Sequence, residues 1–105
     1  SPPLRKHSRG ARWLRVEFEW DAEKAQANLS KHGVSFETAA QIFKRDRLNV
    51  RAEWVENEFR ETDIGIADNL VIFVVAHTDR SGITRIISAR RATRNERKLF
   101  DDYYS

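Results

Sequence analysis

The stretch LVIFVVA at residues 70–76 decides the fold, because every one of its positions is apolar. A strand with apolar side chains on both faces is typical of the middle of a sheet that is covered, at least partly, on both sides. The strand itself is expected over Leu70–Thr78, and short polar connections separate it from neighbouring strand-like runs, which are Leu48–Val55, Phe59–Ala67 and Ile83–Ala89. Consecutive strands joined by short connections usually pair antiparallel, so the sequence predicts an antiparallel meander.

Helical patterns precede these strands. Val16–Trp20 first alternates apolar and polar residues, as a half-buried strand does. Asp21 is then placed to cap a helix that ends at Gly33. Ser35 is placed to cap a second helix, whose apolar residues recur at helical spacing: Phe36, Ala39, Ala40 and Phe43. Both helices are expected to pack on the sheet.

A final helix is predicted from the sequence TRNE at residues 93–96, which has the spacing of a capping box. It is expected to continue to Tyr103 or Tyr104. The predicted fold class is therefore α+β, with an antiparallel β-sheet of about four to five strands, two N-terminal helices and one C-terminal helix.

The composition indicates one small globular domain. The chain has 105 residues, of which 40% are hydrophobic and 33% charged, and no apolar run approaches the roughly 20 residues of a membrane span. Because it has no cysteine and three scattered histidines, it lacks disulfides, a thiol nucleophile and a convincing zinc site. We therefore expect a cytoplasmic protein that uses no cofactor, no metal and no membrane.

Charge is distributed unevenly along the chain. The formal net charge is +3, but residues 1–15 hold five of the 19 basic residues and no acid. This segment contains both prolines and is interpreted as a flexible basic extension or a cloning remnant outside the fold, so the domain is expected over residues 16–105. The domain itself is then slightly acidic, and any site for polyanions must be local.

Such a site is predicted where the last strand-like run leads into the last helix. No Asp or Glu lies between Arg80 and Asn95. Around the single acid Glu96 the chain gathers six basic residues: Arg85, Arg90, Arg91, Arg94, Arg97 and Lys98. Guanidinium groups donate two parallel hydrogen bonds to a phosphate, and the free N–H groups of a helix N-terminus also bind anions. The sequence therefore predicts that this corner binds polyanions.

The alternation of side chains along a strand determines whether Arg85 and Arg90 can contact the same ligand. It places Arg85 on the face of Ile87 and Ala89, and it places Arg90 on the face of Ile86. Arg85 and Arg90 then face one ligand only if the strand twists or ends between them.

Some of these basic residues could form ion pairs within the protein and take no part in binding a polyanion. A charged side chain within an apolar strand needs a partner, so Arg85 serves either the site or an ion pair with Glu61 or Asp63. Arg97 and Lys98 are expected to be solvated helix residues, which pair with Glu96 and with Asp101 or Asp102.

Histidines and aromatic residues offer further candidates. His32, beside Lys31 at a helix end, is placed either to handle protons or to cap the helix. His77 is expected at the exposed end of the central strand, as a surface histidine or a catalytic group. Three aromatic residues could stack on bases or belong to the core: Trp20, Trp54 and Phe73.

Three blocks of sequence together resemble the BrnT toxin family: FEWD at residues 18–21, KHGVSFE at residues 31–37 and RIISARRA at residues 85–92. The resemblance spans about residues 16–104. It implies a RelE-like fold and a metal-independent endoribonuclease toxin of a type II toxin–antitoxin system, which inhibits translation. It also implies a BrnA-like ribbon-helix-helix antitoxin as partner, with operator DNA bound only through the antitoxin complex.

By position in these blocks, the resemblance implies catalytic roles for five residues. Arg85, Arg90 and Arg91 would hold the phosphate and its transition state, and Lys31 or His32 would handle protons while the 2′-OH of RNA attacks. The general base stays unassigned.

An alternative is a non-catalytic RelE/ParE-like module that binds and blocks a target, or that only docks with the antitoxin. In either case an acidic antitoxin segment is expected to cover the basic corner, with apolar contacts from Trp54, Phe59 or Leu99.

Overall fold

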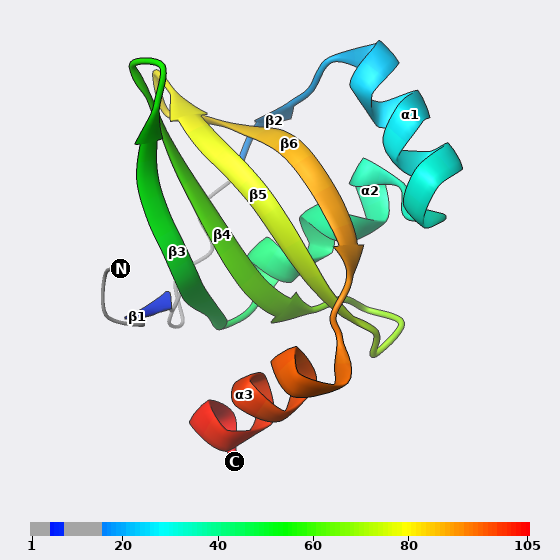
Figure 1. The fold of residues 1–105 in the computed structure, drawn as a ribbon, viewed down its shortest axis with the longest axis vertical. Coiled ribbons are helices and arrows are strands. Elements are labelled where there is room, and N and C mark those ends of the chain that lie inside the picture. The colour runs from blue at the N-terminus through cyan, green and yellow to red at the C-terminus, as the bar shows by residue number, and fades with distance from the viewer. Residues whose placement is uncertain (1–4, 8–15) are drawn as a thin grey trace.

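The structure, a computed structural model, describes residues 5–7 and 16–105 and has the expected α+β fold (Figure 1). Its centre is a six-stranded sheet in the order β1-β3-β4-β5-β6-β2. Along the chain the elements are β1 (Arg5–His7), β2 (Phe18–Glu19), α1 (Ala22–His32), α2 (Phe36–Ala39), the 3₁₀ helix η1 (Ala40–Lys44), β3 (Arg47–Val55), β4 (Glu58–Ile66), β5 (Ile72–Arg80), β6 (Ile83–Arg91) and α3 (Arg94–Tyr104).

Strands β3 to β6 form the predicted antiparallel meander. The turn between β3 and β4 has positive φ at Glu56 (49°) and Asn57 (67°), and the turn between β5 and β6 has positive φ at Ser81 (53°) and Gly82 (85°). Two successive left-handed residues are what a two-residue hairpin turn needs to match the twist of its strands. The meander is confirmed, with strand bounds within two residues of those expected.

Strand β5 lies inside the sheet, and both of its faces pack against other residues. On one face α1, α2 and η1 cover the sheet, where Phe36 and Ile42 pack with Val75 and Ile86. These four side chains are at most 1% exposed. This cluster is the larger of the two apolar cores.

The opposite face has a smaller core at the end of the sheet nearest α3. Leu48, Ile64 and Val74 come from three neighbouring strands and pack against Phe100 of α3. Figure 1 shows α3 crossing beneath this end of the sheet after the chain leaves β6. Because α3 covers only this end, the described residues leave much of the same face open.

The predicted caps hold the N-terminal helices. Asp21 accepts hydrogen bonds from two backbone N–H groups of the first turn of α1, and Gly33 ends that helix with φ 67°. Ser35 accepts a hydrogen bond from the Thr38 N–H at the start of α2. The second predicted helix is divided, because its continuation after Ala39 tightens into η1.

Two short edge strands add to the meander. Within the expected strand Val16–Trp20, only Phe18–Glu19 forms β2, and it pairs with β6 in parallel. Arg5–His7 forms β1, which pairs antiparallel with β3. The expectation that all of residues 1–15 lie outside the fold is therefore wrong for Arg5–His7, and the rest of that segment lies outside the described residues.

Helix α3 begins with the predicted capping box, in which Thr93 and Glu96 exchange side chain-to-backbone hydrogen bonds. Near its end, the Tyr104 hydroxyl donates to the backbone oxygen of Arg47 at 2.7 Å. The helix is thus fixed at both ends. Within the part of the chain that the structure describes, no helix has the length and apolarity to cross a membrane.

Candidate functional site

A β-bulge in β6 determines which side chains reach the open face of the sheet. Ile86 pairs with His77 and Ser88 pairs with Ala76, so two consecutive residues of β5 face three residues of β6. The additional residue is Ile87. Such an insertion shifts the alternation of all residues that follow it.

The bulge overturns the predicted facing of the arginines. Ile86 and Ala89 are both 1% exposed and lie in the same core, although simple alternation would have placed them on opposite faces. Arg85 precedes the bulge and Arg90 follows it, and each is adjacent in sequence to one of these core residues. Arg85 and Arg90 therefore share the face that is opposite the larger core.

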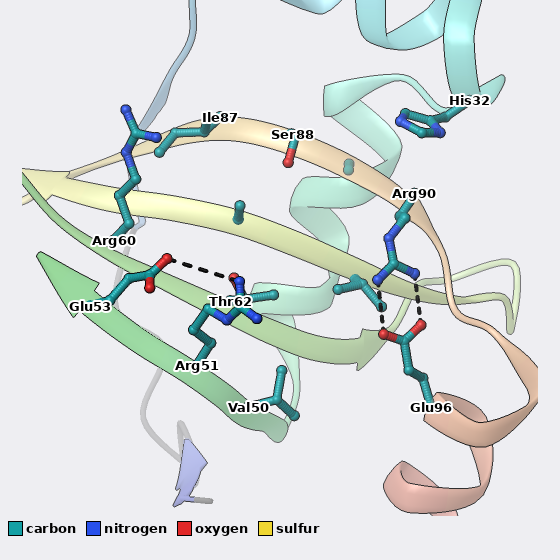
Figure 2. Close-up of a pocket in the computed structure, with 13 residues that line it drawn as sticks. His32, Val50, Arg51, Glu53, Arg60, Thr62, Ile87, Ser88, Arg90 and Glu96 are labelled. Carbon is teal, nitrogen blue, oxygen red and sulfur yellow. Dashed lines mark hydrogen bonds and ion pairs between the residues drawn. The ribbon is translucent and has the colours of Figure 1, made fainter. Parts of the chain in front are cut away.

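On that face, the described residues enclose a hollow of about 550 Å³ across β3 to β6 (Figure 2). Its floor consists of small and apolar side chains. Its polar residues, which define what we call the basic hollow, are His32, Arg51, Glu53, Arg60, Thr62, Ser88, Arg90 and Glu96. Three guanidinium groups and an imidazole thus face two carboxylates.

The strand register gathers the charges of β3 and β4. Arg51 is opposite Thr62 and Glu53 is opposite Arg60, so all four side chains lie on one face. Figure 2 shows them at one end of the basic hollow, with His32, Arg90 and Glu96 at the other. Arg51 approaches Glu53 only loosely, at 3.9 Å, and Arg60 donates to Glu58 at 2.9 Å.

Arg90 and Glu96 form a two-pronged ion pair. Arg90 Nη1 lies 2.7 Å from Glu96 Oε1, and Nη2 lies 2.8 Å from Oε2. Donation by Arg90 outweighs partial burial and lowers the pKa of Glu96 to about 2, while the same contact raises the pKa of Arg90. Glu96 therefore stays ionised at every cellular pH.

This pair replaces the one expected for Glu96 within α3. Arg97 instead donates to the backbone oxygen of Ala92 at 3.2 Å. The expected pairing of Lys98 with Asp102 is present at 3.6 Å, between two exposed side chains.

Arg85 pairs with neither of its expected carboxylates. Its Nη1 lies 2.5 Å from Glu19 Oε2 on the adjacent strand β2, and it does not line the basic hollow. Asp63 is bound elsewhere, by Arg47 Nε at 2.7 Å and by Asn49 Nδ2 at 2.7 Å. Glu19 lies far from Arg85 in the sequence, so the local pattern of residues around Arg85 did not indicate this ion pair.

His77 is buried, contrary to the expectation of an exposed strand end. It is 7% exposed, its ring packs edge-on against Phe43 with centroids 4.9 Å apart, and its Nε2 lies 3.1 Å from Asp63 Oδ2. Burial raises the pKa of Asp63, but the neighbouring His77, the hydrogen bond from Asn49 and the charge of Arg47 together lower it below its usual value. This buried polar cluster faces the helices and lies away from the basic hollow.

Of the five predicted catalytic residues, the structure brings Arg90 and His32 into the basic hollow. Arg91 is exposed at the end of β6, opposite Phe73 of β5, and Lys31 is exposed on α1. Neither lines the basic hollow, and nor does Arg85.

Sequence reasoning missed Arg51 and Arg60, although a signal for them exists. Polar residues alternate along both strands of the first hairpin, at Arg51 and Glu53 and again at Arg60 and Thr62. Two adjacent strands with polar alternate positions indicate an uncovered sheet face.

The candidate base-stacking residues lie elsewhere. Trp54 is 71% exposed and packs with Phe59, at the hairpin end of the opposite sheet face. Trp20 packs on Phe36, and Phe73 belongs to the larger core.

Comparison with known proteins agrees with this architecture. Residues 20–96 match the family described as "Ribonuclease toxin, BrnT, of type II toxin-antitoxin system". The fold is similar to that of the ribonuclease toxin BrnT of Brucella abortus, with a TM-score of 0.57 and 23% identity over 76% of this chain and 100% of that chain. Among curated protein sequences, none matches. The chain therefore belongs to the BrnT family of ribonuclease toxins of type II toxin–antitoxin systems.

Proposed function

We propose that this toxin cleaves RNA in the basic hollow. The observation that carries the proposal is the gathering of Arg51, Arg60, Arg90 and His32 from three strands and a helix around one open hollow. Guanidinium groups stay charged at any cellular pH and bind phosphate oxygens with two hydrogen bonds each. An RNA strand that crosses the hollow could place neighbouring phosphates at its two ends.

The reaction begins when the 2′-OH attacks the adjacent phosphorus. His32 takes the hydroxyl proton, the P–O2′ bond forms, the P–O5′ bond breaks, and water at the open side protonates the leaving 5′-oxygen. The products are a 2′,3′-cyclic phosphate and a 5′-hydroxyl. Arg90 stabilises the additional negative charge of the pentacovalent transition state.

This reaction needs no metal, because the arginines provide the positive charge and the nucleophile belongs to the substrate. Cleavage of messenger RNA in the cytoplasm would inhibit translation.

The partner that neutralises the toxin would be a ribbon-helix-helix antitoxin of the BrnA type. Its acidic segment would cover the basic hollow and satisfy the charges of Arg51, Arg60 and Arg90. Operator DNA would be bound through the antitoxin and not through this chain.

The direct test is incubation of the purified toxin, without antitoxin, with total RNA in EDTA. We expect fragments that end in 2′,3′-cyclic phosphates, and we expect none from the Arg90→Ala variant. If RNA stays intact both with and without ribosomes while the toxin still slows growth, a non-catalytic module that blocks its target is the better description.

A further inference from the structure

The arginine of the basic hollow that faces α3 is fixed in position before any ligand arrives. Arg90 Nη1 donates to Glu96 Oε1 at 2.7 Å and to the backbone oxygen of Arg91 at 3.3 Å, and Nη2 donates to Glu96 Oε2 at 2.8 Å. A guanidinium has five N–H groups. The Nε–H and the second Nη2–H remain, and they point in parallel from one edge of the plane. That edge has the geometry to bind two oxygens of one phosphate.

Glu96 is itself fixed, so it can act as a support. Its Oε1 accepts a hydrogen bond from the Thr93 backbone N–H at 2.9 Å, and its own N–H donates to Thr93 Oγ1 at 3.2 Å. It lies in the first turn of α3, where the helix dipole favours a negative charge. A carboxylate bound on both sides in this way has little freedom to move.

Arg51, at the other end of the basic hollow, is held far less firmly. Its side chain is 67% exposed and its carboxylate partner is 3.9 Å away. Such an arginine loses side-chain entropy when it binds a phosphate, whereas Arg90 has already lost that freedom on folding.

We propose that Glu96 is a positioning residue of the ribonuclease site, which orients Arg90 so that its Nε–Nη2 edge receives the scissile phosphate. This inference rests on the proposed function. The alternative is that Glu96 acts only by electrostatic repulsion, so that a carboxylate beside the phosphate site weakens RNA binding and does nothing else. If Glu96 acted through its charge alone, removing that charge would strengthen RNA binding and would not slow cleavage.

The Glu96→Gln variant separates the two views, because it retains an oxygen for the Thr93 N–H but places an amide NH₂ against Arg90. We expect kcat for an RNA oligonucleotide to fall about 10- to 100-fold, as for a misplaced catalytic group. KM should stay equal or decrease, since a negative charge has been removed. Adding the same substitution to Arg90→Ala should restore no cleavage.

Two control variants exclude indirect effects. Asp102→Asn removes the same charge from the same helix, at an exposed pair outside the basic hollow. Tyr104→Phe removes the hydroxyl that fixes the far end of α3 to the backbone oxygen of Arg47. Both should cleave RNA at the wild-type rate, and a loss in Tyr104→Phe equal to that in Glu96→Gln would overturn the inference in favour of helix stability.

A measurement without cleavage distinguishes this inference from the proposed function. In ¹⁵N NMR spectra, the Arg90 Nε–Hε signal should be sharp in the wild type, shift when a non-cleavable 2′-O-methyl RNA binds, and broaden in Glu96→Gln. A wild type that binds this RNA with that shift, but cleaves no RNA, would refute the nuclease and leave the positioning role intact. An unchanged kcat in Glu96→Gln, or an Arg90 signal that RNA does not shift, refutes the positioning role.

Discussion

Replacing Arg90 by alanine should impair stability as well as activity, because it leaves the Glu96 carboxylate without its cation. The pKa of Glu96 is about 2 instead of 4.5, mainly through donation by Arg90. A difference of that size corresponds to ~3 kcal/mol. The Arg90 side chain is 41% exposed, so solvent screens the pair, and the Thr93 N–H still binds Glu96 in the variant. We therefore expect the free energy of unfolding to fall by about 1–2 kcal/mol at neutral pH.

The direction of the Glu96 pKa shift determines how the stabilisation by the Arg90–Glu96 pair depends on pH. The pKa of Glu96 is lower in the folded than in the unfolded state, so the stabilisation is complete above about pH 5 and disappears as the pH falls toward about 2. The difference between wild type and Arg90→Ala should therefore be smaller at about pH 3 than at neutral pH.

Urea unfolding followed by tryptophan fluorescence at pH 7 and pH 3 measures both quantities. Lys98→Ala is the matched control, since it removes a positive charge from an exposed pair at 3.6 Å and should cost less than about 0.5 kcal/mol. Equal unfolding midpoints of wild type and Arg90→Ala at pH 7 would refute the argument. So would a difference that is the same at both pH values.

Three further substitutions test other parts of the structure. Arg51→Ala with Arg60→Ala should raise KM for RNA more than it lowers kcat, and should reduce the slope of log affinity against log salt by about 0.7 per lost phosphate contact, in titrations by fluorescence anisotropy. His32→Gln should lower kcat by about 100-fold or more, because an amide does not accept the proton of the 2′-OH, and cleavage at the wild-type rate would assign proton transfer to another group. Asp63→Asn should lower the free energy of unfolding by about 2–4 kcal/mol in urea titrations, since Arg47 and His77 lose a buried anion, whereas a loss below ~1 kcal/mol would contradict the buried cluster.

Elements with local signals were predictable from the sequence. The caps at Asp21, Ser35 and Thr93 lie where they were expected, since a cap depends on residues within one turn of the helix. The antiparallel meander was equally predictable, because short connections leave little choice of pairing.

The candidate site was only partly predictable, because its geometry depends on contacts between distant segments. Glu19 meets Arg85 across 66 positions of sequence, and no local pattern indicates that pairing. The alternation argument failed on β6 because it assumes two residues per repeat throughout, and Ile87 interrupts that repeat. Arg90 was identified from charge density alone, without the ion pair to Glu96 that fixes its direction.

The bulge at Ile87 resembles a frameshift within the strand. A regular strand would place Arg85 and Arg90 on opposite faces, because four residues separate them, and the extra residue Ile87 is what brings both to the open face. Deleting Ile87 would restore regular alternation with three residues between the two arginines, so both would still share that face. In related proteins, the length of this strand between its two arginine positions is therefore as informative as the arginines themselves.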